Sequence, residues 1–370
     1  MMEAAFNSAR RACYAGLDSV TLRREVADRV SDAIPFDAQA FSTCDPDTGL
    51  VTHTIADGVP GPLGRVYVEM LYPTALARMA MDMPRRGRNV FSMAEQSEAT
   101  NAALREYGIR QQFHVSIASA GRLWGTWCLM RSSESSPSRR REYAFLARLA
   151  PHLARGLQSA ALLDRGIADS ESDEDSAAGV LVLDRRYCPI LQTPVATRWL
   201  EDLRDIGLTL PEDVPLSILG LAREVRTRPD EGGFERHLRG RGRSGRWYSM
   251  RASLAEPDAS GESAVVIVIR PALPQEIANV LTRLYALSPR EREVIAAVAR
   301  GEATKCIAET LKLSPHTVTE HIQRACDKIG VRGRKALIAR LFFDGYAPTL
   351  KAEKPTLSDA LRVERRQIAV

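Results

Sequence analysis

The chain has 370 residues, which is long for one compact domain and predicts two or three. Its hydrophobic content of 45% and charged content of 26% are ordinary for soluble globular protein. The formal net charge of +5 permits nucleic-acid binding without requiring it. Most of this excess is local, because Arg290 to Asp344 holds eleven Lys or Arg against seven Asp or Glu, a difference of +4.

Cysteine usage and hydropathy exclude several classes of protein. The six cysteines form no CxxC pair, which argues against a structural zinc site and against a secreted disulfide framework. The N-terminus lacks the apolar stretch and cleavage site of a secretion signal, and no apolar run reaches about eighteen residues. We therefore expect a cytoplasmic protein without a membrane segment, a metal site or a cofactor.

The first block, residues 1–163, mixes helices and strands. Leu17–Ala33 has apolar residues at helical spacing. Phe113–Ala118 and Leu123–Met130 are rich in β-formers, and the turn between them contains glycine, which predicts a hairpin. A long amphipathic helix follows, in which Pro151 predicts a kink or a break. This order of elements resembles a GAF domain.

Two tryptophans in the predicted hairpin invite a ligand-pocket interpretation. Trp124 and Trp127 are three residues apart on a strand, so they point to opposite faces and at most one can line a cavity. Core packing is the expected role of both.

An acidic stretch free of large apolar residues apart from Ile167 predicts an exposed linker at 164–177. The second block, 178–270, opens with a strand at Gly179–Leu183 and closes with strands at Trp247–Leu254 and Ser263–Ile269. Strands at both ends with helices between them are similar to a PAS domain.

The second block also contains a basic run, Arg236–Arg251. Such a run could bind nucleic acid. We favour a solvated loop that enters the strand at Trp247.

The third block, 276–347, predicts a series of short helices. Ser288 to Glu291 has the form of a capping box, with proline at the first helical position. Gly301 is placed to end this helix in a left-handed conformation. A second helix at about Thr304–Leu311 is separated from a third, Pro315–Ile329, by a three-residue turn.

The third predicted helix has two distinct faces. Ser314 is its expected N-cap, and Leu313 is placed to contact Val318. The inward positions are Val318, Ile322, Ala325 and Ile329. The opposite face is polar near the helix start, where a recognition helix reads base edges, and it contains Thr319, Glu320, Gln323 and Arg324. We take Cys306 and Cys326 as small core residues.

At this point the sequence resembles a known family. SPREREV at 288–294, KxIA at 305–308, LxLSxxTVxxHI at 311–322 and KIGVRxR at 328–334 stand in the order found in the DNA-binding domain of the LuxR/FixJ family of bacterial transcription regulators. The match covers about sixty residues, a sixth of the chain. The resemblance implies a tetrahelical helix-turn-helix fold, with a fourth helix at about Arg334–Phe343.

The resemblance also implies roles for matched residues. Base-reading positions fall on Thr319, Glu320 and Gln323. The predicted phosphate contacts are Thr304, Lys305, Ser314, His316, Thr317, Arg324, Lys328, Arg332 and Arg334. The fourth helix is where such domains commonly dimerise, and the candidates for that face are Leu337 and Leu341.

One departure from the family pattern concerns the reading face. The family usually has lysine where Thr319 stands, so the target sequence is open. Glu320 could accept a hydrogen bond from a cytosine amino group, and Gln323 could pair with adenine. His321, between the reading face and the core, is expected to pack or to form a hydrogen bond within the domain.

Together these features predict a multidomain protein with α+β sensory domains, GAF-like and then PAS-like, followed by an all-α helix-turn-helix domain and a charged tail at 348–370. The predicted function is sequence-specific transcription regulation, in which the input domains control a homodimer on double-stranded promoter DNA. RNA polymerase and an unidentified small-molecule ligand are further partners to consider. Activation and repression both stay open.

Two rival classes were weighed. An enzyme targeted to DNA is disfavoured, because the chain lacks a nucleophile elbow, a metal-spaced His or Glu cluster and a phosphate loop, and we assign no catalytic residues. The alternative that stays open is an interaction protein, or antagonist, that retains the helix-turn-helix fold without binding DNA. Thr319 favours it, whereas Lys305 and the arginines after the third helix oppose it.

Overall fold

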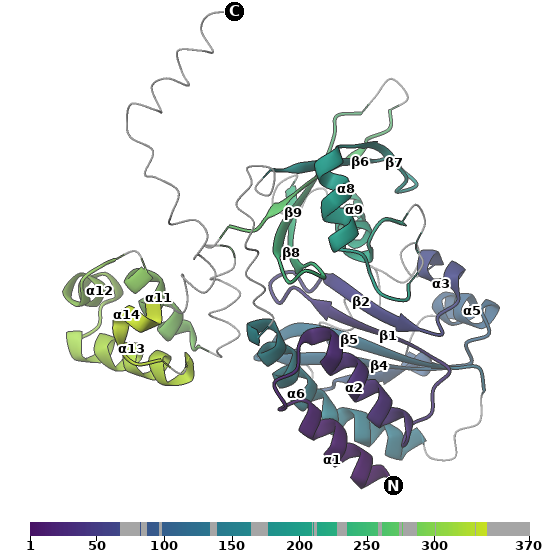
Figure 1. Ribbon diagram of the computed structural model, residues 1–370, viewed down its shortest axis with the longest axis horizontal. Helices are drawn as coiled ribbons and strands as arrows, with labels where there is room; N and C mark the ends of the chain where they lie inside the picture. Colours follow the sequence, from purple (N-terminus) through teal and green to yellow (C-terminus); the bar gives the residue numbers. More distant parts are fainter. Residues whose placement is uncertain are drawn as a thin grey trace, which may run out of the picture. The chain divides into compact units, whose positions relative to one another are not determined.

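The computed structural model describes residues 1–66, 82, 87–95, 98–133, 139–163, 177–208, 210, 213–227, 235–257, 261–273, 276, 287–299, 301–329 and 331–338. The chain divides into two compact units, Met1–Ala286 and Leu287–Val370 (Figure 1). The predicted acidic linker, apart from residue 177, and the predicted tail lie outside the described residues.

The first unit begins with a five-stranded antiparallel sheet in the order β2-β1-β5-β4-β3. Its strands are β1 (Ala38–Cys44), β2 (Val51–Asp57), β3 (Val90–Ser92), β4 (Gln111–Ser119) and β5 (Arg122–Arg131). The hairpin predicted around Gly121 is confirmed as β4–β5. Ala120 and Gly121 both have positive φ, 51° and 72°, which matches the twist of the strands they join.

Helices cover both faces of this sheet. One face carries α1 (Met2–Ala12), α2 (Ser19–Ser31) and α6 (Arg139–Leu163), which share a core with Phe41 and Trp127 (Figure 1). The other face carries α3 (Gly61–Val66), a 3₁₀ turn η2 (Met93–Glu95) and α5 (Glu98–Glu106).

Of the two alternatives predicted for Pro151, a break is wrong, because α6 continues through that residue, and a kink stays a prediction. Proline removes one helical hydrogen bond. The buried stripe of α6 compensates through packing, and its leucines Leu146, Leu149, Leu153 and Leu157 are at most 4% exposed.

A second five-stranded antiparallel sheet follows in the order β7-β6-β10-β9-β8. Its elements are β6 (Gly179–Leu183), β7 (Pro189–Gln192), α8 (Pro194–Asp202), α9 (Leu216–Thr227), β8 (Glu235–Arg241), β9 (Trp247–Leu254) and β10 (Val265–Pro271). The strands predicted at 179–183 and 247–254 are confirmed. The basic run at 236–251 is not a loop, because its two halves pair as the hairpin β8–β9.

The core of the second sheet extends to the edge of the first sheet region. Cys44, Val51 and Leu123 of the first sheet region pack with the buried side chains of the second. Ile206 joins the edge of β2, where its carbonyl accepts from the Ala56 amide at 2.8 Å and its amide donates to the Thr54 carbonyl at 2.9 Å. The predicted division between the two blocks at 164–177 therefore stays a prediction.

The second unit is helical where it is described, with α11 (Pro289–Ala299), α12 (Thr304–Leu311), α13 (Pro315–Ile329) and α14 (Gly333–Ile338). Its core contains Val294, Val298, Ile307 and Val318. The predicted fold class is confirmed as two antiparallel sheets with helices, followed by a helical domain.

A buried carboxylate fixes the junction of the two sheets. Asp205 accepts hydrogen bonds from the Thr54 amide at 2.7 Å and from the Leu216 amide at 2.8 Å. Burial raises the pKa of Asp205 to about 6. The hydrogen bonds from the two amides act to lower this pKa, but the effect of burial is larger.

We expect Asp205→Asn to destabilise the first unit by roughly 1–3 kcal/mol, because an amide hydrogen of the new side chain then competes with a backbone N–H. The pKa of Asp205 is raised from 3.8 to about 6 on folding, so its contribution to stability falls as pH rises through that window. The Asn variant lacks this titrating group. The difference in free energy of unfolding between wild type and the variant should therefore become smaller as pH rises from about 4 to about 6.

Urea unfolding across this pH range measures both effects. Asp213→Asn is the matched control, because this side chain is 70% exposed and asparagine tolerates its φ of 58°. A gap that stays constant with pH would contradict the role of Asp205.

Candidate nucleic-acid interface

The first helix of the second unit begins with the predicted capping box. The Ser288 amide donates to a Glu291 carboxylate oxygen at 2.7 Å, and the Glu291 amide donates to Ser288 Oγ at 3.2 Å. The same carboxylate accepts from Lys328 Nζ at 2.7 Å. Burial acts to raise the pKa of Glu291, and the bonds from Lys328 and Ser288 outweigh it, so the pKa is lowered. The cap of α11 is thereby tied to the end of α13.

The turn between α12 and α13 is fixed at the α12 end. Lys312 adopts the left-handed conformation with φ of 53°, and the Leu313 amide donates to the Ala308 carbonyl at 2.8 Å. Arg290 reaches across from α11 and donates to the Leu311 carbonyl at 2.7 Å. Sequence reasoning missed this bond, because pattern alone assigns Arg290 only to the exposed start of α11.

The start of α13 is capped as predicted. Ser314 Oγ accepts from the Thr317 amide at 3.0 Å, and Pro315 is the first helical residue. Leu313 packs against the cluster that contains Val318, as the staple prediction requires. These contacts fix the orientation in which α13 leaves the turn.

The two faces of α13 have the predicted burial. Val318 and Ala325 are fully buried and Ile329 is 6% exposed, whereas Ile322 is half-buried. The three predicted base-reading residues, Thr319, Glu320 and Gln323, are all exposed.

The three predicted base-reading side chains have contacts with residues four positions away on α13. Thr319 Oγ1 donates to the Pro315 carbonyl at 3.0 Å, and Gln323 Nε2 donates to Asp327 at 2.9 Å. Glu320 pairs with Arg324 at 3.5 Å. Contacts between residues four apart on a helix contribute a few tenths of a kcal/mol, so a ligand can displace them.

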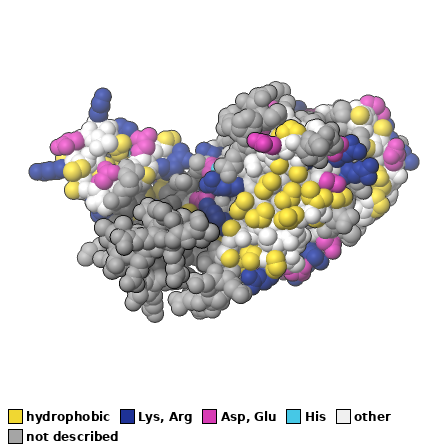
Figure 2. Space-filling model, turned by 90° about the horizontal axis from the view of Figure 1, so that it is seen from above, with side chains coloured by type: hydrophobic (Ala, Val, Ile, Leu, Met, Phe, Trp, Pro, Cys, Tyr) yellow, Lys and Arg dark blue, Asp and Glu magenta, His cyan; other side chains and the backbone are white. Residues whose placement is uncertain are grey.

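The predicted phosphate-contacting residues divide by exposure. Those fully at the surface are Lys305, Ser314, His316, Arg324, Lys328 and Arg332, and those half-buried are Thr304, Thr317 and Arg334. Lys and Arg side chains project from this unit in Figure 2. Arg334 donates to the Glu302 carbonyl, and Lys328 pairs with Glu291, so both also hold the domain together.

Two expectations for this unit need correction. Leu337 is 0% exposed and packs inside the domain, so its side chain does not contribute to an exposed dimer face. Cys306 is exposed, whereas Cys326 is buried as expected. Cys306 lies away from the inward face of α12, which is formed by Ile307 and Ala308. Leu341 lies outside the described residues.

Other site classes were sought across the described part of the chain. There, no group of His, Cys, Asp and Glu side chains has an arrangement that could hold a metal ion. None of the described helices combines the length and the hydropathy that crossing a membrane requires.

Comparison with known proteins assigns this second unit. Residues 285–341 match the family of bacterial regulatory proteins described as the luxR family. The probable transcriptional regulatory protein NarL of Mycobacterium tuberculosis is 45% identical over 53 residues, which are 14% of this chain and 24% of that protein. The spore germination protein GerE of Bacillus subtilis is 42% identical over 55 residues, 15% of this chain and 74% of that protein. The chain thus spans about a quarter of NarL and most of GerE.

Solved structures give only slight likeness. The GAF domain of a phosphoenolpyruvate-protein phosphotransferase from Coxiella burnetii overlaps 42% of this chain and 92% of its own, with 16% identity and a TM-score of 0.30. SdiA of Escherichia coli overlaps 87% of this chain and 91% of its own, with 13% identity and a TM-score of 0.29. Overlaps of this quality indicate neither a function nor a ligand.

The Glu291 link gives a local test of the architecture. We expect Glu291→Ala to weaken α11 by about 1–2 kcal/mol, because it removes one half of the capping box and the partner of Lys328. Hydrogen exchange of the α11 amides should then accelerate about 5–30-fold.

Glu293→Ala is the matched control on the same helix, since this carboxylate is 49% exposed in its pair with Arg290. Its expected cost is below about 0.5 kcal/mol. Equal acceleration in both variants would show that Glu291 has no special role.

Proposed function

The chain belongs to the luxR family of bacterial regulatory proteins, and on that premise we propose that it is a sequence-specific DNA-binding transcription regulator. The observation that carries the proposal is the start of α13. A capped helix leaves a fixed turn and presents three exposed polar side chains, Thr319, Glu320 and Gln323, in its first half.

In this proposal α13 enters the major groove and reads base edges. Gln323 has the donor and acceptor that pair with adenine, and Glu320 can accept from a cytosine amino group. The side chain of Thr319 is shorter than the lysine that the family usually has at this position. We therefore expect it to contact a phosphate or a thymine methyl group. Lys305, Arg332 and the other surface cations supply the salt-sensitive share of the affinity.

We further propose that the first unit controls a homodimer in the cytoplasm, and that neither unit is an enzyme. A dimer would place two α13 helices on half-sites about one helical turn apart. An apolar surface for such pairing is available, since Val266 pairs with Val182, and Val182 with Leu191, on the face of the second sheet away from its core. Figure 2 shows hydrophobic side chains gathered on one face of the first unit. In this proposal the dimer contacts RNA polymerase while it is bound to promoter DNA.

A second function stays in consideration because threonine occupies position 319. An antagonist that retains the fold would bind a protein partner and not DNA. Selection of genomic fragments by the full-length protein at two salt concentrations separates the two functions. Enrichment of a two-part site supports the regulator, and absence of DNA binding at both salt concentrations supports the antagonist.

Substitutions at the two kinds of contact should have different effects. We expect Gln323→Ala to relax the preference at one base position by about 1–3 kcal/mol, because it removes a base contact. We expect Lys305→Ala to weaken all sequences alike and to reduce the salt slope by about 1, because it removes a phosphate contact. Titration of the selected site and its single-base variants at several salt concentrations measures both. Identical base preferences in wild type and Gln323→Ala would remove Gln323 from the reading set.

A further inference from the structure

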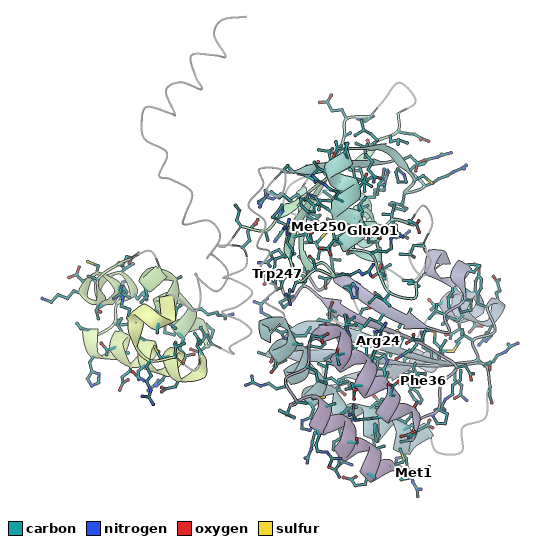
Figure 3. All side chains as sticks on the ribbon, in the orientation of Figure 1. Met1, Arg24, Phe36, Glu201, Trp247 and Met250 are labelled. Atoms are coloured by element: carbon teal, nitrogen blue, oxygen red, sulfur yellow. The ribbon has the colours of Figure 1, made fainter. Side chains whose placement is uncertain are left out.

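A pocket of about 410 Å³ lies between the two sheets of the first unit. Its walls come from the start of α2, the connection between β1 and β2, β5, the end of α6 and the hairpin β8–β9. Trp247, labelled in Figure 3 at the start of β9, is one of the lining residues. The volume is within the range of small-molecule sites.

The hairpin that forms one wall is the tip of the basic run. Asp202, at the end of α8, holds this tip by accepting from the Ser244 amide at 2.7 Å, from Ser244 Oγ at 2.6 Å and from Tyr248 Oη at 2.8 Å. A Cβ at Gly242 would lie 2.0 Å from the Asp202 carboxylate, so only glycine allows this approach. The arginines beside it therefore stand on a fixed backbone.

The charge of the lining is positive. It contains four arginines and two aspartates, for a formal difference of +2, and these residues are Arg23, Arg239, Arg241, Arg243, Asp18 and Asp45. Both carboxylates are already engaged. Asp18 caps α2 by accepting from the Val20 and Thr21 amides, and Asp45 is paired with Arg239. Arg243 is exposed, and its positive charge helps to lower the pKa of His53.

Two residues of the lining each carry a buried N–H donor, inaccessible to water, that has no acceptor among the residues that the structure describes. Arg23 donates to His53 Nδ1 at 2.9 Å, so the proton of the neutral imidazole sits on Nε2, and this atom is unpaired. Burial, with the charges of Arg23 and Arg243, lowers the pKa of His53 to about 3 and keeps it neutral. Trp124 Nε1 is the second unpaired donor. A buried donor without a partner destabilises the protein, and an acceptor on a ligand would offset that cost.

The remainder of the wall is apolar. Val20, Leu157, Trp124 and Trp247 contribute aliphatic and aromatic surface. A positive wall with spare donors fits an anion, and the apolar wall fits a hydrocarbon body attached to it. We propose that this pocket binds a small organic carboxylate, with its anionic group toward Arg243, His53 and Trp124 and its apolar body between Leu157 and Trp247.

The pocket is also linked to the segment that leads to the second unit. Arg239 lines the pocket and donates through Nη1 to the Glu276 carbonyl at 3.1 Å. The Glu276 carboxylate is itself held by Arg270 at 2.9 Å and by Ser249 at 3.1 Å. A ligand that contacts Arg239 would thus change the hydrogen bond between Arg239 and Glu276, the last described residue before the helix-turn-helix unit. This regulatory part rests on the proposed function, whereas ligand binding does not.

Calorimetry on the full-length protein without DNA tests the binding site. The probes are 2-naphthoate and hexanoate, with 2-naphthamide as the neutral match and inorganic phosphate as the anion without an apolar body. The expected result is binding of both acids, at least about tenfold tighter than the amide or phosphate, as one charge-assisted hydrogen bond gives. No binding of either acid, or equal binding of acid and amide, would overturn the proposal. Phosphate binding as tight as that of the acids would also overturn it.

Variants locate the site. Arg243→Ala and Trp124→Phe should each weaken 2-naphthoate about fivefold, because each removes one donor and Phe keeps an aromatic ring in the wall. Arg186→Ala is the matched control, an exposed arginine in the turn between β6 and β7, and it should bind as wild type does. If Arg243→Ala and Trp124→Phe both bind as tightly as Arg186→Ala, the anion does not occupy this pocket.

Regulation is measured separately, as the affinity for the selected DNA site with and without saturating 2-naphthoate. A changed affinity supports the link through Arg239 and requires an equal reciprocal change in ligand affinity. An unchanged DNA affinity with ligand bound overturns the link and leaves the pocket standing. Absence of any DNA binding would count against the proposed function, and the calorimetric result would be unaffected.

Discussion

The first unit depends on one buried ion pair. The Asp45 carboxylate, at 0% exposure, accepts from the Arg239 amide at 2.9 Å and from the guanidinium at 3.3 Å, and Arg239 also pairs with Asp47. Asp45 follows β1 and Arg239 belongs to β8, so the pair joins the two sheets. Two buried charges are costly unless every donor and acceptor is used, and removal of one partner leaves the other uncompensated. The pair therefore specifies one relative position of the sheets more strongly than the apolar core around it, which tolerates small shifts.

The second unit is organised in a different way. Its anchors, from Ser288 with Glu291 to Ser314 with Thr317, are mostly short-range, and Lys328, Arg290 and Arg334 add links between segments distant in sequence. Short-range caps depend on residue type at fixed spacing. The anchors of α11 and α13 therefore lie within the second unit itself.

This difference explains how much the sequence could predict. The helices at 304–311 and 315–329, the capping box and the exposed reading face were predicted to the residue, because caps and periodicity are local signals. The β1 and β2 strands were missed, since many of their buried positions are polar residues, which sequence patterns assign to the surface; these are Gln39, Ser42, Thr52, His53 and Thr54. The Asp45–Arg239 pair joins residues 194 positions apart, and no local pattern connects them. Trp124 is buried, as expected, and it also lines the pocket of the first unit, whereas Trp127 does not, in keeping with the argument that at most one of the two could line a cavity.

The basic run shows why charge alone is a poor guide to function. As a string it suggests a surface for nucleic acid, or a solvated loop. Folded, its arginines separate by role: Arg239 is buried in the ion pair, Arg241 donates to the Gly245 carbonyl at the hairpin turn, and Arg243 stays exposed beside the pocket. Gly242 permits the tight approach to Asp202, and Gly240 lies against Met250 and Thr52, so both glycines are required by packing. Three arginines of one short run thus occupy three different environments, which the string of charges by itself does not distinguish.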